Sequence, residues 1–121
     1  MEGTGPGKTQ KIGQWGEVLA IRYLAENGYQ ILHQNWRSGR QEIDCIAQIG
    51  DTLVFVEVKT RKNNNYGYPE QFVDKQKIAF IKKAAREYLW QVNHKGNIRL
   101  DILAISGFGE KVDLHHLQDA F

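Results

Sequence analysis

The segment from Thr52 to Thr60 constrains the fold of this chain more than any other. It is rich in β-branched residues, and its apolar residues run almost without interruption, which is typical of a central strand covered on both faces. Glu57-Val58-Lys59 stands at its end. Side chains alternate along a strand, so Glu57 and Lys59 share one face. Two opposite charges at the end of a core strand must pair, meet solvent or bind a ligand, because burying unpaired charge is costly.

A second predicted strand, from Glu42 to Ile49, places another carboxylate beside this one. Gly50-Asp51 between the two segments predicts a tight turn, which makes them a β-hairpin. Asp44 lies six residues before Gly50 and Glu57 six after Asp51, so the two acids should stand nearly opposite each other. Cross-strand neighbours have Cβ atoms about 5 Å apart. One cation could therefore bridge both carboxylates.

Two interpretations of these charges follow. Mg²⁺ takes oxygen ligands and often needs only one or two carboxylates besides water and substrate phosphate. Lys59 beside the metal could hold the attacking water, lower its pKa, or stabilise the phosphate. The alternative is an ion pair of Lys59 with Asp44 or Glu57 at the end of a sheet. Spacing alone does not decide between them, but one lysine cannot neutralise two adjacent carboxylates, which favours a cation.

The remaining patterns predict one α/β domain. Apolar residues at spacings of three and four predict helices at 10–27 and 74–93. Strands are predicted at 29–32, 42–49, 52–60, 98–105 and 112–117, with a turn at 106–109. This order indicates an α/β fold, a mixed central β-sheet flanked by α-helices. Residues 1–9 are Gly-rich and are expected to form a flexible tail, and residues 10–121 a single domain.

The composition bears on the cellular compartment and on the kinds of partner that this chain could bind. The single cysteine, Cys45, permits no internal disulfide and fits a reducing compartment. No apolar run is long enough for a membrane span or a signal peptide, so we expect a cytoplasmic protein with no membrane partner. A net charge of +2 is too small to argue for nucleic acid by itself. Clustered basic residues can line a phosphate-binding face, although for any one cluster solvated surface is the simpler interpretation.

Several motifs taken together resemble the YraN family of small predicted endonucleases. The motifs are Glu42-Ile43-Asp44, Phe55-Val56-Glu57-Val58-Lys59-Thr60-Arg61, Gly13-x-x-Gly16-Glu17 with Ala20 and Tyr23-Leu24, Gly28-Tyr29, Asn35-x-Arg37, Tyr66-Gly67, Lys75, Arg99-Leu100-Asp101 and Ala120-Phe121. The family is similar in fold to archaeal Holliday-junction resolvases and to the restriction-endonuclease superfamily. That superfamily's signature is an aspartate, followed by a Glu or Asp two residues before a lysine. Asp44, Glu57 and Lys59 match it, with Ile43 in place of the proline that often precedes the aspartate.

The resemblance implies a restriction-endonuclease-like core and a Mg²⁺- or Mn²⁺-dependent deoxyribonuclease. Asp44 and Glu57 would bind the metal, and Lys59 would stabilise charge or position water. Glu17 would assist from the first helix, although a glutamate on the flank of a helix is ordinarily solvent-facing. Branched or junction DNA as substrate, and a two-fold homodimer to cut it, follow by analogy only.

Basic residues near the signature are the candidates for nucleic-acid binding. They are Arg37, Arg40, Arg61 and Lys75. Lys75 is unusual on local grounds, because a cation in the first turn of a helix opposes the helix dipole and a nearby phosphate would offset that cost. Of the three tryptophans, Trp36 is the only candidate for stacking on nucleic-acid bases. Arg99 and Asp101 share one strand face and can pair with each other.

Two rival hypotheses use the same residues without catalysis. A nucleic-acid-binding module could keep the nuclease fold and do no chemistry. A structural or adaptor protein could use Asp44, Glu57 and Lys59 only as an ion-pair network. All the signature residues are present, which favours the enzyme.

Overall fold

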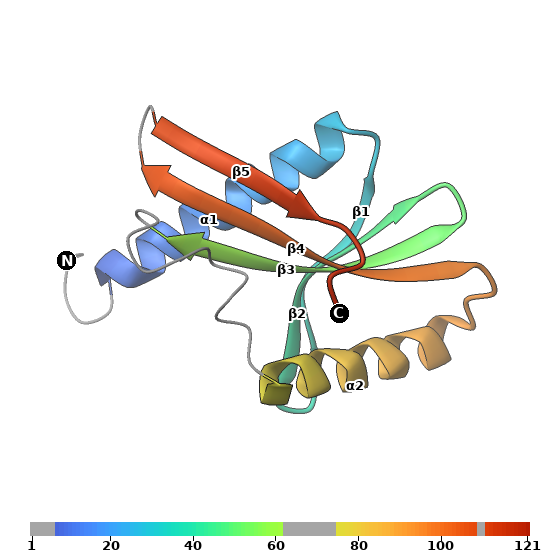
Figure 1. Cartoon of the computed structure of the whole chain (residues 1–121). Helices are drawn as coiled ribbons and strands as arrows, with labels where there is room; N and C mark the ends of the chain where they lie inside the picture. The colour runs from blue at the N-terminus through green and yellow to red at the C-terminus, as the bar shows by residue number, and fades with distance from the viewer. Residues whose placement is uncertain (1–6, 62–74, 109–110) are drawn as a thin grey trace.

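The computed structural model describes residues 7–61, 75–108 and 111–121. Its elements in chain order are α1 (Gly7–Glu26), β1 (Gln30–Ser38), β2 (Gln41–Ile49), β3 (Thr52–Arg61), α2 (Lys75–Val92), β4 (Asn97–Phe108) and β5 (Lys111–Leu117). The five strands form one sheet in the order β1-β2-β3-β4-β5, in which β3 and β4 are parallel and the other neighbours antiparallel (Figure 1). The predicted α/β fold with a mixed sheet is confirmed.

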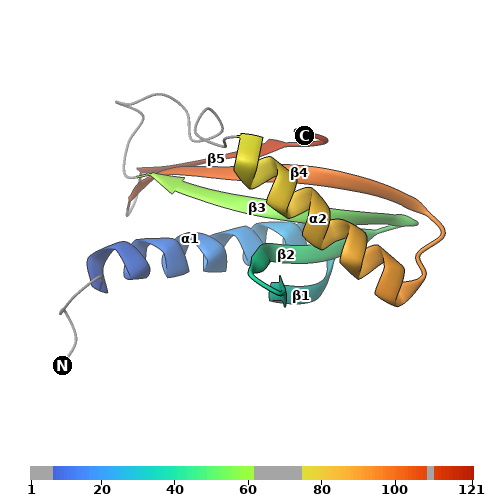
Figure 2. The same ribbon diagram turned by 90° about the horizontal axis from the view of Figure 1, so that it is seen from below.

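The two helices cover opposite faces of the sheet (Figure 2). Along β3, Val54 and Val56 belong to the apolar cluster under α1, whereas Leu53 and Phe55 belong to the cluster under α2. All four side chains are buried. β3 is therefore the central strand covered on both faces that its apolar sequence predicts. Neither described helix is long and apolar enough to span a membrane.

Some boundaries differ from the sequence-based ones. α1 begins at Gly7, three residues before its predicted start, and β1 continues to Ser38 because it pairs with β2 along this length. The predicted turn at 106–109 is wrong at its start, because Ser106 and Gly107 pair with β5 inside β4. Gly107 has φ +96°, and a Cβ there would collide with the backbone carbonyl of Lys111, so this glycine marks a close strand approach. Residues 1–6, Tyr66-Gly67, the helix start at Asp74, and Gly109 lie outside the described residues.

The pairing of Arg99 with Asp101 is confirmed and belongs to a larger buried network. Asp101 is fully buried and accepts hydrogen bonds from Arg99 Nη2 (2.9 Å), His116 Nε2 (2.6 Å) and the Asp119 N–H (2.9 Å). Arg99 also donates to the Tyr29 hydroxyl at 2.6 Å. Burial alone would raise the pKa of Asp101, but the hydrogen bonds outweigh it and lower the pKa. The network fixes β4, β5, Tyr29 and the C-terminal segment to one another, on the strand that pairs with β3.

Candidate functional site: a fork between two strands

The candidate site lies where β2 leaves β3. The antiparallel ladder runs to the pair Cys45 with Val56, and the same register continued by one step would set Asp44 opposite Glu57. At this step the Asp44 carboxylate, rather than a backbone carbonyl, accepts a hydrogen bond from the Val58 N–H, with 2.8 Å between Oδ2 and N. The two acids predicted to be neighbours therefore stand side by side at the point where the hairpin opens.

The side chains of β2 change from one core layer to the other at Asp44. Cys45 packs in the cluster under α1, whereas Ile43 packs in the cluster under α2. In a regular strand, residues two apart share one face. Because these two do not, β2 changes its facing at Asp44. The aspartate thus stands at the boundary between the two core layers, within electrostatic reach of side chains from both helices.

Glu57 is the most buried acid of this site and is contacted by two amines. Its side chain is 5% exposed, and its Oε2 lies 3.5 Å from Nζ of Lys59 and 3.5 Å from Nζ of Lys77. Lys59 comes from the same strand, as predicted, whereas Lys77 comes from α2. The carboxylate is therefore shared between the sheet and the helix that covers it.

Lys77 is a site residue that the sequence analysis missed. The lysine predicted from the sequence was Lys75, which the structure places at the exposed first position of α2. Residues two apart on a helix point about 200° away from each other, so the two lysines cannot both face the sheet. The signal was present in the apolar stripe of α2, because Lys77 precedes the buried residues Ile81, Ala84 and Tyr88 at helical spacing.

Glu17 reaches the same neighbourhood from α1. Partial burial raises its pKa, and the charges of Glu42 and Glu57 raise it further, against a hydrogen bond with Asn35 that lowers it. The helix comes close enough because Gly16 lies against Thr60 of β3, where a Cβ on Gly16 would collide with the threonine side chain. Glu17 is accordingly not the fully solvated glutamate of the alternative interpretation.

The electrostatics of Asp44 describe the site as a whole. Burial and the charge of Glu57 raise the pKa of Asp44 to about 7. The hydrogen bond from Val58 and the charge of Lys77 lower the pKa, and Glu17 raises it further. Burial first, and then the charges of Glu57 and Glu17, thus disfavour the ionised form of Asp44, and an additional cation would relieve this penalty.

The donor set suits a hard divalent cation. Within the described ranges no group of three or more His, Cys, Asp or Glu side chains is arranged to hold a metal. The site instead offers two neighbouring carboxylates, and Mg²⁺ often takes only one or two, completing its shell with water and phosphate. Cys45 contributes no thiolate, because burial, and then the charge of Asp44, raises its pKa to about 12. The oxygen donors therefore fit Mg²⁺ or Mn²⁺.

The predicted phosphate-binding residues divide into two pairs. Arg37 is largely exposed and lies 3.5 Å from Glu42, Nε to Oε2. Arg61 ends β3, two residues beyond Lys59, and donates to the Thr60 carbonyl. Arg40 lies in the exposed turn between β1 and β2, and Lys75 at the exposed start of α2. Of the four, Arg37 is thus paired with an acid of β2 and Arg61 lies on the strand that carries Glu57 and Lys59, whereas Arg40 and Lys75 are exposed at the ends of elements.

The fold and this site define a small α/β protein with an acidic, lysine-flanked fork in its central hairpin. The sequence profile of the uncharacterised protein family UPF0102 matches residues 16–105. The chain belongs to this family, which confirms the resemblance to YraN proteins.

Individual relatives cover nearly the whole chain. A UPF0102 protein of Cytophaga hutchinsonii is 43% identical over 100 residues, which is 83% of this chain and 87% of the relative. A UPF0102 protein of Rhodococcus opacus is 45% identical over 112 residues, 91% of this chain and 95% of the relative. Among solved structures, Pyrococcus furiosus SfsA in complex with Ca²⁺ aligns with a TM-score of 0.37 and 14% identity, covering 90% of this chain and 64% of SfsA.

Proposed function

We propose that this chain is a divalent-metal-dependent endonuclease that hydrolyses phosphodiester bonds in DNA. The observation that carries the proposal is the placement of Asp44 and Glu57 together at the fork, with two lysine amines 3.5 Å from Glu57. Three acids stand with two lysines at this site, and the remaining negative charge favours the binding of a cation. The lysine amines favour the binding of a phosphate group beside that cation.

Each residue of the fork has a role in this proposal. Asp44 and Glu57 would hold Mg²⁺ or Mn²⁺, with Glu17 assisting. The bound cation supplies Lewis-acid polarisation of the phosphodiester and neutralises its charge. Lys59 has a side chain only 21% exposed, so its amine can donate to a phosphate oxygen, or position the attacking water, with little competition from solvent. Lys77 holds Glu57 from the side of α2.

The substrate half of the proposal rests on the basic residues around the fork. Arg37 and Arg61 would contact the phosphates beside the cleaved bond, and Arg40 and Lys75 those further away. Branched or junction DNA remains the substrate class to test first. A two-fold homodimer would present two forks to such a substrate, one for each of two symmetric strands.

A cleavage assay tests the proposal directly. Linear, flapped and four-way DNA would be incubated with wild-type protein and increasing Mg²⁺ or Mn²⁺, alongside Asp44→Asn, Glu57→Gln and the exposed control Asp51→Asn. We expect metal-dependent cleavage by wild type and by the control. Each fork variant should lose more than the ~10- to 100-fold that removal of an outer-shell partner costs. Fork variants as active as wild type, or a wild type inactive on all three DNAs, would contradict the proposal.

A second candidate function is a nucleic-acid-binding module without catalysis. It is favoured by the two lysines on Glu57, which already offset part of the buried charge in the absence of a cation. The same experiment separates the two functions. The binding module predicts DNA binding that weakens with salt, no cleavage with either metal, and equal binding by wild type and Glu57→Gln.

A further inference from the structure

The outer face of α2 carries an aromatic residue that packing does not explain. The side of the helix that faces the sheet is filled by buried residues including Ile81, Ala85 and Tyr88. Trp90 lies outside this stripe and is 83% exposed. Trp36, the tryptophan selected from the sequence, instead packs edge-on against Tyr88 with 5.3 Å between ring centroids. Trp90 is thus the indole available for contact with a partner.

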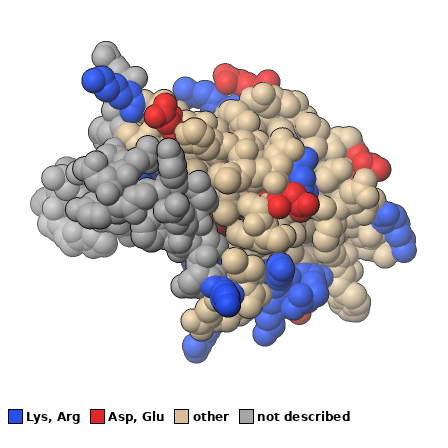
Figure 3. All heavy atoms as spheres, in the orientation of Figure 1, with Lys and Arg blue, Asp and Glu red and all other residues tan. Residues whose placement is uncertain are grey.

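Basic side chains surround Trp90. Lys82, Lys83 and Arg86 are all exposed on α2, and Figure 3 shows lysine and arginine side chains gathered along the lower edge of the molecule, where this helix lies. Lys83 and Arg86 line, with Glu87 and Trp90, an open hollow of about 540 Å³. This face therefore joins an exposed aromatic ring to an excess of positive charge.

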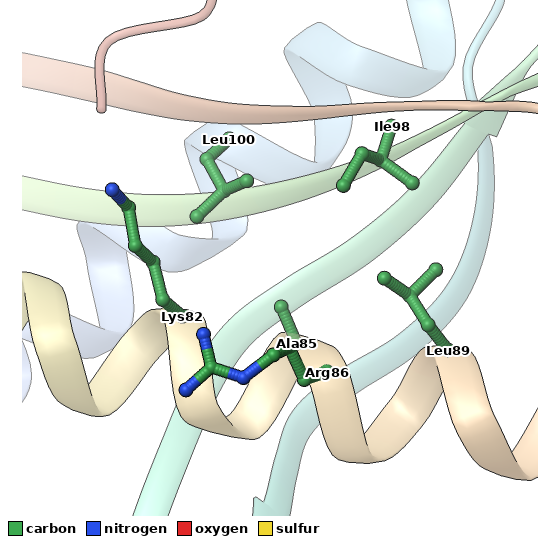
Figure 4. Close-up of a pocket in the computed structure, with 6 residues that line it drawn as sticks. All are labelled: Lys82, Ala85, Arg86, Leu89, Ile98 and Leu100. Carbon is green, nitrogen blue, oxygen red and sulfur yellow. The ribbon is translucent and has the colours of Figure 1, made fainter.

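Arg86 also borders a second hollow, between α2 and β4. This hollow, of about 190 Å³, is lined by Lys82, Ala85, Arg86, Leu89, Ile98 and Leu100 (Figure 4). Its walls are mainly apolar, with Ile98 47% exposed, and its two charged residues are both cations. An apolar group could thus be accommodated in this hollow beside the side chain of Arg86.

We infer that the outer face of α2 binds a single strand of nucleic acid. Trp90 stacks on a base, while Lys83 and Arg86 pair with the phosphates on either side of it. Proteins that bind single strands combine an aromatic platform with basic residues, because every base offers a ring face and every linkage a negative charge. An acidic protein would offer negative charge but no ring face beside each charge, and in a duplex the ring faces are already stacked.

The position of this surface on α2 indicates a substrate class for the proposed nuclease, and this part of the inference rests on the proposed function. Trp90 follows Lys77 by 13 residues on the same helix, so the two lie about 20 Å apart along its axis and point to different sides of it. A strand that leaves the fork would therefore pass around α2 over several nucleotides to reach the indole. The substrate class is therefore DNA with an unpaired segment next to the cleaved bond, such as a flap or a splayed end.

Binding can be measured without cleavage. Fluorescence anisotropy of labelled dT20 and of a 20-base-pair duplex would be recorded in EDTA over a range of salt concentrations. Trp90→Ala should weaken dT20 binding about 5- to 150-fold and affect the duplex far less, whereas Trp90→Phe should retain most of the affinity. Lys83→Ala/Arg86→Ala should reduce the salt slope by about 1.4. The control Arg22→Ala, exposed on α1, should bind like wild type.

Several outcomes would overturn the inference. One is dT20 binding by Trp90→Ala equal to wild type, in a variant whose circular dichroism and thermal unfolding show that it is folded. Competition by polyglutamate as effective as that by unlabelled dT20 would assign the face to an acidic protein, and a Trp90-dependent dimer in sedimentation would assign it to a second copy of this chain. Flap cleavage at the wild-type rate by Trp90→Ala would refute the inference and leave the nuclease standing. If the wild-type protein cleaves no DNA but its binding to dT20 depends on Trp90, the nuclease proposal would be refuted and the binding surface on α2 would stand.

Discussion

At the residue scale, Asp44 is subject to opposing influences. The hydrogen bond from the Val58 N–H favours its ionised form, whereas burial and the neighbouring Glu57 favour its protonated form. The second influence is stronger, because the pKa of Asp44 rises to about 7. Near neutral pH, and without a cation, this carboxyl is therefore about half protonated. Under the proposed function, a cation that binds this carboxylate would displace the proton.

The raised pKa of Asp44 makes stability depend on pH. The unfolded chain releases this proton near pH 4 and the folded chain near pH 7, so the free energy of unfolding falls as pH rises between these values. Asp44→Asn removes the charge but keeps an oxygen that can accept from Val58. In EDTA, we expect the variant to be more stable than wild type by about 4 kcal/mol at pH 8, and nearly equal to it in stability at pH 4. Urea unfolding at the two pH values measures the difference.

The exposed turn provides the control for this prediction. Asp51→Asn makes the same chemical change in the exposed turn between β2 and β3, outside the buried fork, and should not produce a comparable change between pH 4 and pH 8. An Asp44→Asn effect of equal size at both pH values would contradict the prediction, because it would then arise from packing rather than from a proton.

The sequence was sufficient for some residues of the site and insufficient for others. Counting from the turn at Gly50 placed Asp44 opposite Glu57, because strand periodicity is local and reliable where one face is buried. The change of facing between Ile43 and Cys45 was not predictable, since that count assumes a regular ladder. Lys77 was missed because Lys75 was judged by the helix dipole alone, whereas burial on the Ile81 stripe decided which lysine faces the sheet.

At the element scale, the central hairpin and both helices were predictable from their apolar patterns, and the ends of elements were not. Ser106-Gly107 has the composition of a turn, yet it continues β4 because its backbone pairs with Val112 and Asp113. Propensity acts on a few residues, whereas pairing with β5 depends on residues that follow the turn. The close approach of α1 to β3 was likewise not predicted, because it depends on a contact between segments far apart in the chain.

That approach depends on Gly16 and can be tested by a double-mutant cycle. Gly16→Ala adds a methyl group against Thr60, which should cost about 1–3 kcal/mol, more than the ~1 kcal/mol that alanine contributes to helix stability. We expect Gly16→Ala to destabilise wild type more than it destabilises Thr60→Ala, in which the Oγ1 and Cγ2 contacts are gone and only the Cβ of residue 60, 3.2 Å away, remains. Urea unfolding of the four proteins gives the coupling energy. Equal effects of Gly16→Ala in both backgrounds would show that the helix does not rest on Thr60.

At the scale of the whole molecule, the fork joins all three layers. Its residues come from α1 (Glu17), β2 (Asp44), β3 (Glu57) and α2 (Lys77). A cation held by Asp44 and Glu57 would stabilise the folded chain and not the unfolded one, in which the ligands are dispersed. Cation binding should therefore be visible in global unfolding, whether or not DNA is cleaved.

The final prediction concerns this linkage. At a Mn²⁺ concentration of about 100 times its dissociation constant, the free energy of unfolding should rise by about 2.7 kcal/mol, which corresponds to roughly 10 °C in Tm for a domain of this size. The shift should be larger at pH 8 than at pH 6, because the metal competes with the proton that Asp44 retains up to about pH 7. Differential scanning calorimetry at both pH values measures the shift, with Asp51→Asn expected to match wild type and Glu57→Gln expected to lose it. A shift of equal size in Glu57→Gln, or a larger one at pH 6, would place the cation elsewhere on the molecule and remove the fork from consideration as its site.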